Sequence, residues 1–453
     1  MLPVSGKSSK GPEWMGHPPG LFVLAGVELW ERFSFYGLRA LLIPYLLSRP
    51  SLHEFSGLER LSGLLGATSK GETASAIYGL YSGFVYFTPL LGGYLADRWK
   101  NKTILIASGS LLLLLGHLLL ISPHLFLMGL ICIILGTGGI KGNIAAQLGE
   151  LYAPSDQRRE TGFSIFYVGI NIGATLAPVV CGVLAQYVGW QAAFASTSIG
   201  MAIGLLLYGA GLKWLRSGAA HSVGTCPTAD RTASAARIGQ SAIVLGAVVF
   251  CCTSLLWVSY EQQANALMRW CMPSGQNVSL VWLQSVPSVV VLLGTPLVLG
   301  FYRWRSSRGH AADPLSRMTA GAGILVLAQV MLVLGALAVN MLGHPGAAPS
   351  IWLVTAYLVV WEIGDLCFTP AAMGLFSRLA PADRNALPLA LWYLTFFFGN
   401  LGSGWIGMRW GHVSVLSYWL SILIPTLLGA GGILMCRLRH RLSLSASSQV
   451  EMT

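Results

Sequence analysis

The sequence predicts an all-α membrane protein, with about twelve membrane-spanning helices in two bundles of six. Three observations lead to this prediction: the composition, the spacing of the apolar segments and the distribution of the cationic residues. Of the 453 residues, 54% are hydrophobic and only 10% are charged, whereas soluble domains carry about 25% charged residues. So little charge cannot cover a soluble surface of this size, and it indicates a polytopic membrane protein.

Apolar segments recur along the chain at the length of roughly 20 residues that an α-helix needs to cross a bilayer. They predict helices near residues 20–47, 74–96, 103–121, 124–148, 161–187, 190–213, 239–268, 278–302, 316–341, 350–378, 385–410 and 414–437. A stretch rich in Ala, Ser, Thr and Gly divides these segments into two sets of six. We therefore expect an N-terminal tail (1–19), a first bundle (20–215), a linker (216–237), a second bundle (238–437) and a C-terminal tail (438–453).

Lysine and arginine residues concentrate in alternate loops. With both termini in the cytoplasm, twenty of the loop and tail cations lie inside, and five lie outside: Arg49, Arg60, Lys70, Arg269 and Arg409. Because cytoplasmic loops of membrane proteins carry an excess of Lys and Arg, this bias predicts cytoplasmic tails and a cytoplasmic linker. It also accounts for the net charge of +11 without a nucleic-acid partner.

Three charged residues, Glu28, Glu31 and Arg32, lie close together in the first apolar segment. An ionised side chain at the bilayer centre costs roughly 2.5–3.5 kcal/mol even on the insertion scale, so such groups face a bundle interior or an aqueous cavity and pair with one another. On a helix, Tyr36 and Arg39 continue the face that carries Glu28 and Arg32. This polar stripe is typical of a proton or substrate pathway.

Other predicted spans contain the carboxylates Glu261, Glu362 and Asp365 and the cation Lys141. A carboxylate whose cationic partner can move between it and a bound anion acts as a proton switch. The same groups could instead form static ion pairs between helices, and the residue pattern leaves both interpretations open. The eight cysteines form no C-x-x-C pair, so we expect neither a structural disulfide nor a metal site.

Several motifs resemble those of the proton-coupled oligopeptide transporters, the POT or PTR family of the major facilitator superfamily. Residues 28–37 read ELWERFSFYG, similar to the first-helix motif E-x-x-E-R-F-x-Y-Y-G, and residues 166–173 read FYVGINIG, like the fifth-helix motif F-Y-x-x-I-N-x-G. The loop GGYLADRWKNK at 92–102 resembles the superfamily signature G-x-x-x-D-R-x-x-x-[RN]-K. Shorter matches occur at Tyr78, Lys141, residues 261–263 and residues 392–404.

This resemblance implies the major facilitator superfamily fold and the import of di- and tripeptides with protons by alternating access, with no cofactor. It assigns proton coupling to Glu28, Glu31, Arg32 and Glu261. It assigns substrate binding to Arg32, Tyr36, Tyr78, Lys141, Asn171, Asp365 and Trp392. Arg32 and Lys141 would bind the peptide carboxylate, Asn171 would help to hold the amino group, and the aromatic residues would line side-chain pockets. We further expect Arg39 to pair with Glu261 when the outer gate closes.

The chain departs from the family pattern mainly where the substrate amine would bind. Asp365 stands in place of a glutamate, Val286 in place of an asparagine, and Phe35 in place of a tyrosine. We therefore expect carboxylate recognition to be intact and amine recognition to be altered. The alternative is a proton-coupled symporter of another small anion or of a modified peptide, such as a nitrate-like ion or an organic acid. A membrane receptor that binds without transport is a lesser alternative.

Other functional classes lack their motifs. The chain contains no H-E-x-x-H or G-x-S-x-G segment of a membrane hydrolase, so we do not expect an enzyme. It also contains no G-x-x-x-x-G-K-[ST] loop, which disfavours an ATP-driven pump. We expect a monomer as the functional unit, embedded in a plasma membrane or a bacterial inner membrane, with peptide and protons as its partners.

Overall fold

The computed structural model describes residues 13–49, 51–99, 101–153, 156–219, 240–272, 278–310, 312–343, 347–379 and 387–450, and their regular structure is helical throughout. The first part contains α1 (Pro19–Ser48), η1 (Leu52–Glu54), α2 (Leu58–Leu64), α3 (Lys70–Trp99), α4 (Lys102–Leu119), η2 (Pro123–Leu125), α5 (Phe126–Ile140), α6 (Asn143–Glu150), α7 (Arg158–Tyr187) and α8 (Trp190–Ala219). The second contains α9 (Gln240–Tyr260), η4 (Glu261–Gln263), α10 (Ala266–Cys271), η5 (Val278–Ser285), α11 (Val286–Ser307), α12 (Pro314–Met341), α13 (Ile351–Leu379), α14 (Leu387–Gly407) and α15 (Val415–Val450).

Within the described residues, nine helical segments are long and apolar enough to cross a membrane. Helices α1, α3 and α14, which are 30, 30 and 21 residues long, coincide with three further predicted spans. At about 1.5 Å per residue even the shortest of them reaches across the hydrocarbon. Twelve spans remain a prediction. The expected linker falls mostly on residues 220–239, outside the described part, and α15 continues through most of the expected C-terminal tail.

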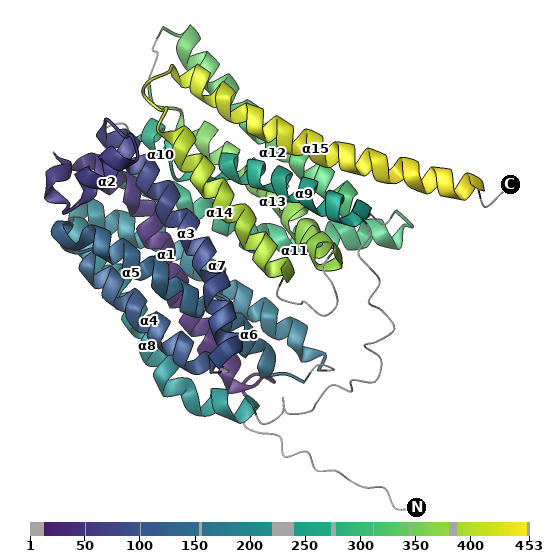
Figure 1. The fold of residues 1–453 in the computed structure, drawn as a ribbon, viewed down its shortest axis with the longest axis horizontal. Coiled ribbons are helices and arrows are strands. Elements are labelled where there is room, and N and C mark those ends of the chain that lie inside the picture. Colours follow the sequence, from purple (N-terminus) through teal and green to yellow (C-terminus); the bar gives the residue numbers. More distant parts are fainter. Residues whose placement is uncertain are drawn as a thin grey trace, which may run out of the picture.

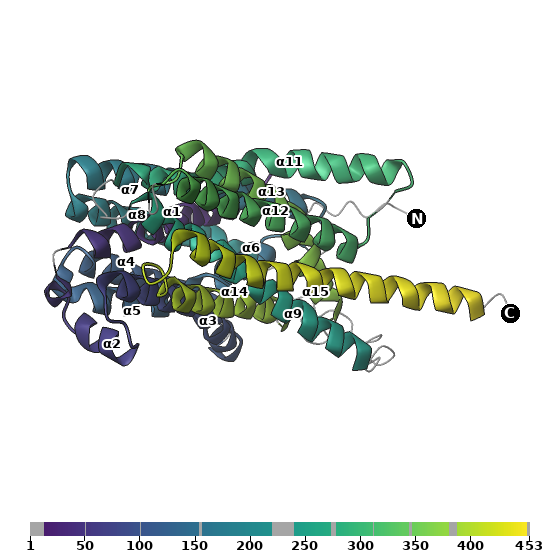
Figure 2. The same ribbon diagram turned by 90° about the horizontal axis from the view of Figure 1, so that it is seen from above.

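The helices form two bundles whose packing is repeated. The first helix of each bundle packs against its fifth and sixth helices, α1 against α7 and α8, and α9 against α14 and α15. Figure 1 shows the two bundles meeting near α10 and diverging away from it. Seen from above, the helices run lengthwise beside one another, and α15 extends beyond its neighbours at its C-terminal end (Figure 2).

The bundles pack against each other mainly through α3 against α14 and α7 against η5 and α11. At the α3–α14 crossing there is no room for a side chain at Gly79. A Cβ atom built on Gly79 would lie 2.6 Å from the Gly404 Cα atom. Small residues at such crossings allow helix backbones in a membrane to approach closely. The glycines therefore allow the two bundles to pack closely at this point.

Two of the predicted spans are interrupted rather than continuous. The span predicted at 124–148 ends as α5 at Ile140 and resumes as α6 at Asn143, around a run that contains glycines 136, 138, 139 and 142. The span at 239–268 changes from α9 to a 3₁₀ turn at Glu261 and then to α10. Glycine lowers helix stability by about 1 kcal/mol per residue, which explains the first break. Both breaks fall at predicted functional residues, Lys141 and Glu261.

Candidate functional site

A cavity of about 240 Å³ lies between the bundles. Its wall is mostly apolar, with aromatic and aliphatic residues and a smaller number of polar groups, as is usual for small-molecule sites. The aromatic residues are Tyr36, Tyr86, Tyr167, Trp257, Tyr260, Trp392 and Phe396. The polar residues include Arg39, Asn171, Gln263, Gln284, Glu362 and Asp365. Both bundles therefore contribute to the wall of one site.

The Arg39 and Glu261 side chains join the bundles beside this cavity. Arg39 Nη2 donates to Glu261 Oε2 at 2.7 Å, and the Tyr78 hydroxyl donates to the same oxygen at 2.6 Å. Arg39 Nε also donates to the Tyr78 hydroxyl at 3.0 Å. The ion pair expected from the sequence is thus present, and α1, α3 and η4 are bound to one another through it.

The Glu28, Glu31 and Arg32 side chains form a second buried cluster, within the first bundle. Arg32 Nε lies 3.1 Å from Glu28 Oε1 and donates a short hydrogen bond to Glu31. The side chains are no more than 6% exposed. In the described part of the structure, Glu28 Oε2 and Arg32 Nη2 have no hydrogen-bond partner. One acceptor and one donor of this cluster therefore remain unpaired within the described residues.

Lys141 is held by aromatic rings instead of by a carboxylate. Its Nζ atom lies 3.5 Å from the centroid of the Tyr86 ring and 5.6 Å from that of Phe35. Arg32 Cζ lies 5.2 Å from the same Phe35 ring, so Phe35 lies against both cations. Among the described residues Lys141 Nζ finds no hydrogen-bond partner. Tyr86 also lines the cavity. The Tyr86 ring therefore separates the unpaired Lys141 ammonium from the cavity.

The opposite wall of the cavity carries two acids, both on α13. Glu362 is 4% exposed, and its Oε2 atom has no hydrogen-bond partner within the described residues. Asp365 Oδ1 accepts a hydrogen bond from the Thr369 hydroxyl at 2.5 Å. Asn171 lies on the facing bundle, where its amide donates to the Tyr167 carbonyl at 2.9 Å. Both acids that line the cavity thus belong to the second bundle, whereas the unpaired donors of Arg32 and Lys141 belong to the first.

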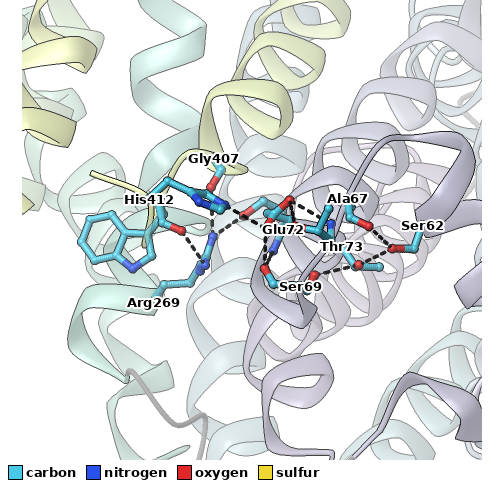
Figure 3. A network of polar contacts seen from close by, with 11 residues as sticks. Ser62, Ala67, Ser69, Glu72, Thr73, Arg269, Gly407 and His412 are labelled. Carbon is cyan, nitrogen blue, oxygen red and sulfur yellow. Dashed lines mark hydrogen bonds and ion pairs between the residues drawn. The ribbon is translucent and has the colours of Figure 1, made fainter. Parts of the chain in front are cut away.

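A third polar network closes the α10 end of the molecule (Figure 3). His412 Nε2 lies 2.8 Å from Glu72 Oε1, and Arg269 donates to the Ser75 hydroxyl at 3.0 Å and to the Gly407 carbonyl at 2.9 Å. Ser75 in turn donates to Asn265 at 2.7 Å. These bonds connect α3 of the first bundle to α10 and the segment after α14 of the second.

Glu72 stands just before the predicted span 74–96, and it is held in its ionised form. Burial by itself would raise the pKa of this carboxyl group. Hydrogen bonds from the Thr68 backbone N–H, the Ser69 hydroxyl, His412 and the Thr68 hydroxyl outweigh that effect and lower the pKa to about 2. The anchor of the network is therefore a carboxylate at any physiological pH.

The predicted site residues fall into two groups. Tyr36, Arg39, Asn171, Asp365 and Trp392 line the cavity. Glu28, Glu31, Arg32, Lys141, Tyr78 and Glu261 lie within the surrounding bundles, outside the set of lining residues. Tyr78 in particular is fully buried and bonds Glu261 instead of forming a side-chain pocket. The predicted roles of these residues stay predictions.

Some cavity residues were not among the predicted site residues. Tyr167 lies inside the fifth-helix motif, and Trp257 and Tyr260 lie just before Glu261, so proximity to a motif was a usable signal for them. Glu362 was evident only as a carboxylate in a predicted span. Tyr86 is separated from every motif in the sequence, and the cavity alone identifies it.

Comparisons with known proteins decide the family. A family model described as the POT family matches residues 102–223 and 230–408. The chain is also 30% identical to the peptide transporter YePEPT of Yersinia enterocolitica, over 91% of each chain. The chain belongs to the POT family. It is 27% identical to a di-/tripeptide transporter of Lactococcus lactis, over 84% of this chain and 87% of that one.

The fold of this POT family member is also that of solved family structures. A crystal structure of the peptide transporter POT in complex with sulfate has a TM-score of 0.78 and 25% sequence identity, over 94% of this chain and 96% of that one. The matched relatives are transporters of peptides by name. The protein is therefore an integral multi-pass membrane protein of a peptide-transporter family.

Proposed function

We propose that this POT family member is a proton-coupled symporter that imports di- and tripeptides by alternating access. The observation that carries the proposal is that both cavity-lining acids lie on the second bundle, whereas two cations with unpaired donors lie in the first. Arg32 and Lys141 of the first bundle have unpaired donors, and Glu362 of the second has an unpaired acceptor. A peptide is a zwitterion, so its carboxylate and ammonium complement these two sides. An anion without an ammonium group would be repelled by the carboxylates of α13, because it has no positive charge to offset them.

The buried charge cluster on α1 offers a physical route to proton coupling. Arg32 holds Glu28 and Glu31 at present. When a peptide carboxylate pairs with Arg32, Glu28 loses its ion-pair partner. Protonation of Glu28 then removes the unpaired negative charge. Charge-assisted bonds of this kind are strong in a low-dielectric interior. Binding of peptide and of proton would then favour each other.

The Arg39–Glu261 pair offers a matching route to gating. It holds the bundles together at the α10 end, which the distribution of loop cations predicts to face outward. A proton on Glu261 would remove the charge that binds Arg39, and this end could open. In the present conformation the pair is formed and the bundles diverge at the other end (Figure 1). In the proposed cycle this conformation corresponds to the inward-facing state.

Uptake of labelled dialanine into proteoliposomes, with and without an inward proton gradient, tests the proposal. We expect accumulation that depends on the gradient and that unlabelled dialanine inhibits. N-acetyl-dialanine, which lacks the ammonium but keeps the carboxylate, serves as the matched ligand and should compete weakly. Absence of dialanine uptake by a folded, inserted protein would refute peptide transport, and equal competition by the acetylated peptide would favour transport of another anion.

A further inference from the structure

Two acids, Glu362 and Asp365, stand three residues apart on α13 and both line the cavity. Residues at this spacing are neighbours on one helix face. Within the described residues neither forms an ion pair, and Glu362 Oε2 has no hydrogen-bond partner although the residue is only 4% exposed. A buried charge without a partner is costly. Two carboxylates can therefore be neutralised by two positive charges, one more than the single α-ammonium group of a peptide supplies.

The neighbouring cavity wall is suited to a cation. Tyr36 and Tyr260 line the cavity together with Glu362, and aromatic faces attract cationic groups. Both rings already face one: Arg39 Cζ lies 6.0 Å from the Tyr36 ring centroid and 5.8 Å from that of Tyr260. The Arg39 charge is already paired with Glu261 at 2.7 Å, and neither acid of α13 forms an ion pair with it.

Counting the charges around the cavity gives the same result. The acids are Glu28, Glu31, Glu261, Glu362 and Asp365, and the cations are Arg32, Arg39 and Lys141. When all of these groups are ionised, the acids exceed the cations by two charges. One coupled proton removes one of them, and a peptide with uncharged side chains carries no net charge. One negative charge then remains, and a substrate with an additional positive charge would balance it.

We propose that Glu362 is a specificity-determining residue that selects peptides whose N-terminal residue has a cationic side chain, such as lysine, arginine or ornithine. Asp365 holds the α-ammonium, and Glu362, one turn closer to the α10 end, receives the side-chain cation. The C-terminal side chain starts near Arg32 and Lys141, which repel a cation there. The inference rests on the proposed peptide-binding function and names the substrate class of the same site.

Competition against counterflow exchange of labelled dialanine tests this inference. The competitors are Lys-Ala, norleucyl-Ala, whose straight side chain lacks the terminal ammonium, and Ala-Lys, which places the cation at the other position. We expect Lys-Ala to compete about tenfold more tightly than norleucyl-Ala or better, and Ala-Lys to show no such advantage. In Glu362→Gln the ratio of Lys-Ala to norleucyl-Ala affinity should fall to about one, whereas Glu362→Asp, which keeps the charge, should retain part of it.

Equal competition by Lys-Ala and norleucyl-Ala in the wild-type protein would overturn the inference, and so would a ratio unchanged in Glu362→Gln. A proton-to-peptide stoichiometry that drops by one in Glu362→Gln, with no change in the ratio, would make Glu362 a second proton carrier instead. Failure of dialanine itself to exchange would refute the proposed peptide transport. Because the readout is a ratio within one variant, a general loss of activity does not imitate the result.

Discussion

Lys141 is the cation whose surroundings differ most from those of an ordinary membrane-embedded charge. Buried ammonium groups are usually paired with an acid, whereas Lys141 Nζ contacts the Tyr86 ring. The sequence could identify Lys141 through its position in a predicted span and through the family resemblance. It could not reveal the contact with Tyr86, because that contact depends on how α3 and α5 pack, and no local pattern encodes it.

Replacement of Lys141 by glutamine should weaken binding of dialanine about tenfold or more. Hydrogen bonds to charged groups contribute about 1.5–3 kcal/mol, and Lys141 supplies one of the two cations available to a peptide carboxylate. Titration of peptide binding in detergent measures the change. Alanyl-alanine amide, which lacks that carboxylate, is the matched ligand and should bind the variant and the wild type with similar, low affinity. A variant that binds dialanine as the wild type does would remove Lys141 from the site.

Glu72 should not contribute to the pH dependence of transport between pH 5 and 8. Its pKa is lowered to about 2 from an ordinary value near 4.5, so the stability it provides is complete above about pH 4.5. That contribution is lost only as the pH falls through about 2. We expect Glu72→Gln to lower the thermal stability of the outer network without moving the pH profile of dialanine uptake. A shift of that profile in the variant would show that Glu72 takes part in coupling.

At the scale of elements, hydrophobicity predicted the positions of the helices but not their interruptions. The breaks after α5 and α9 place Lys141 and Glu261 at interruptions of the α-helices, and interrupted helices are common at binding sites in transporters. Glycines mark the first break in the sequence. The second, around Asn265, whose backbone dihedral angles are −107° and −99°, has no local signature, because contacts between the bundles stabilise it.

The contact between α3 and α14 should be sensitive to a single methyl group. In Gly79→Ala the added Cβ would lie 2.6 Å from Gly404 Cα and 2.9 Å from the Asn400 carbonyl oxygen, so the helices must separate. Overpacking of this kind typically costs about 1–3 kcal/mol. We expect a lower melting temperature and slower uptake of dialanine.

Gly93→Ala, on the same helix, is the matched control for this prediction. A Cβ atom at Gly93 would contact nothing within 4 Å, and alanine favours a helix over glycine by about 1 kcal/mol. Its melting temperature should therefore equal or exceed that of the wild type. Equal melting temperatures for the two alanine variants would contradict the close approach of α3 to α14.

At the scale of the whole molecule, composition and spacing were sufficient to predict two helical bundles. The division of the cavity between them was not predictable from those features, because its wall combines helices that are distant in the sequence. Residues of α1, α7, α9, α13 and α14 all contribute to it. The family motifs identified several of these residues in advance. Only the packing of the two bundles showed that the cavity-lining acids lie on the second bundle and the unpaired donors of Arg32 and Lys141 in the first.

Membrane orientation can be tested with two single cysteines in a cysteine-free background. Ser414 is exposed at the end that contains α10, and Ser306 is exposed at the arginine-rich end of α11. The excess of cations predicts that Ser414→Cys reacts with a membrane-impermeant maleimide on intact cells. Ser306→Cys should react only after the membrane is permeabilised. The reverse pattern would place the tails outside and contradict the predicted topology.

The central claim is that the charge cluster on α1 couples peptide movement to a proton, and Glu28→Gln tests it most directly. In one proteoliposome preparation, gradient-driven accumulation of dialanine and counterflow exchange at equal pH are measured side by side with the wild type. We predict that the variant loses accumulation but keeps exchange, because it binds peptide and can no longer take up and release the proton. Accumulation that persists at the wild-type level would contradict coupling through Glu28.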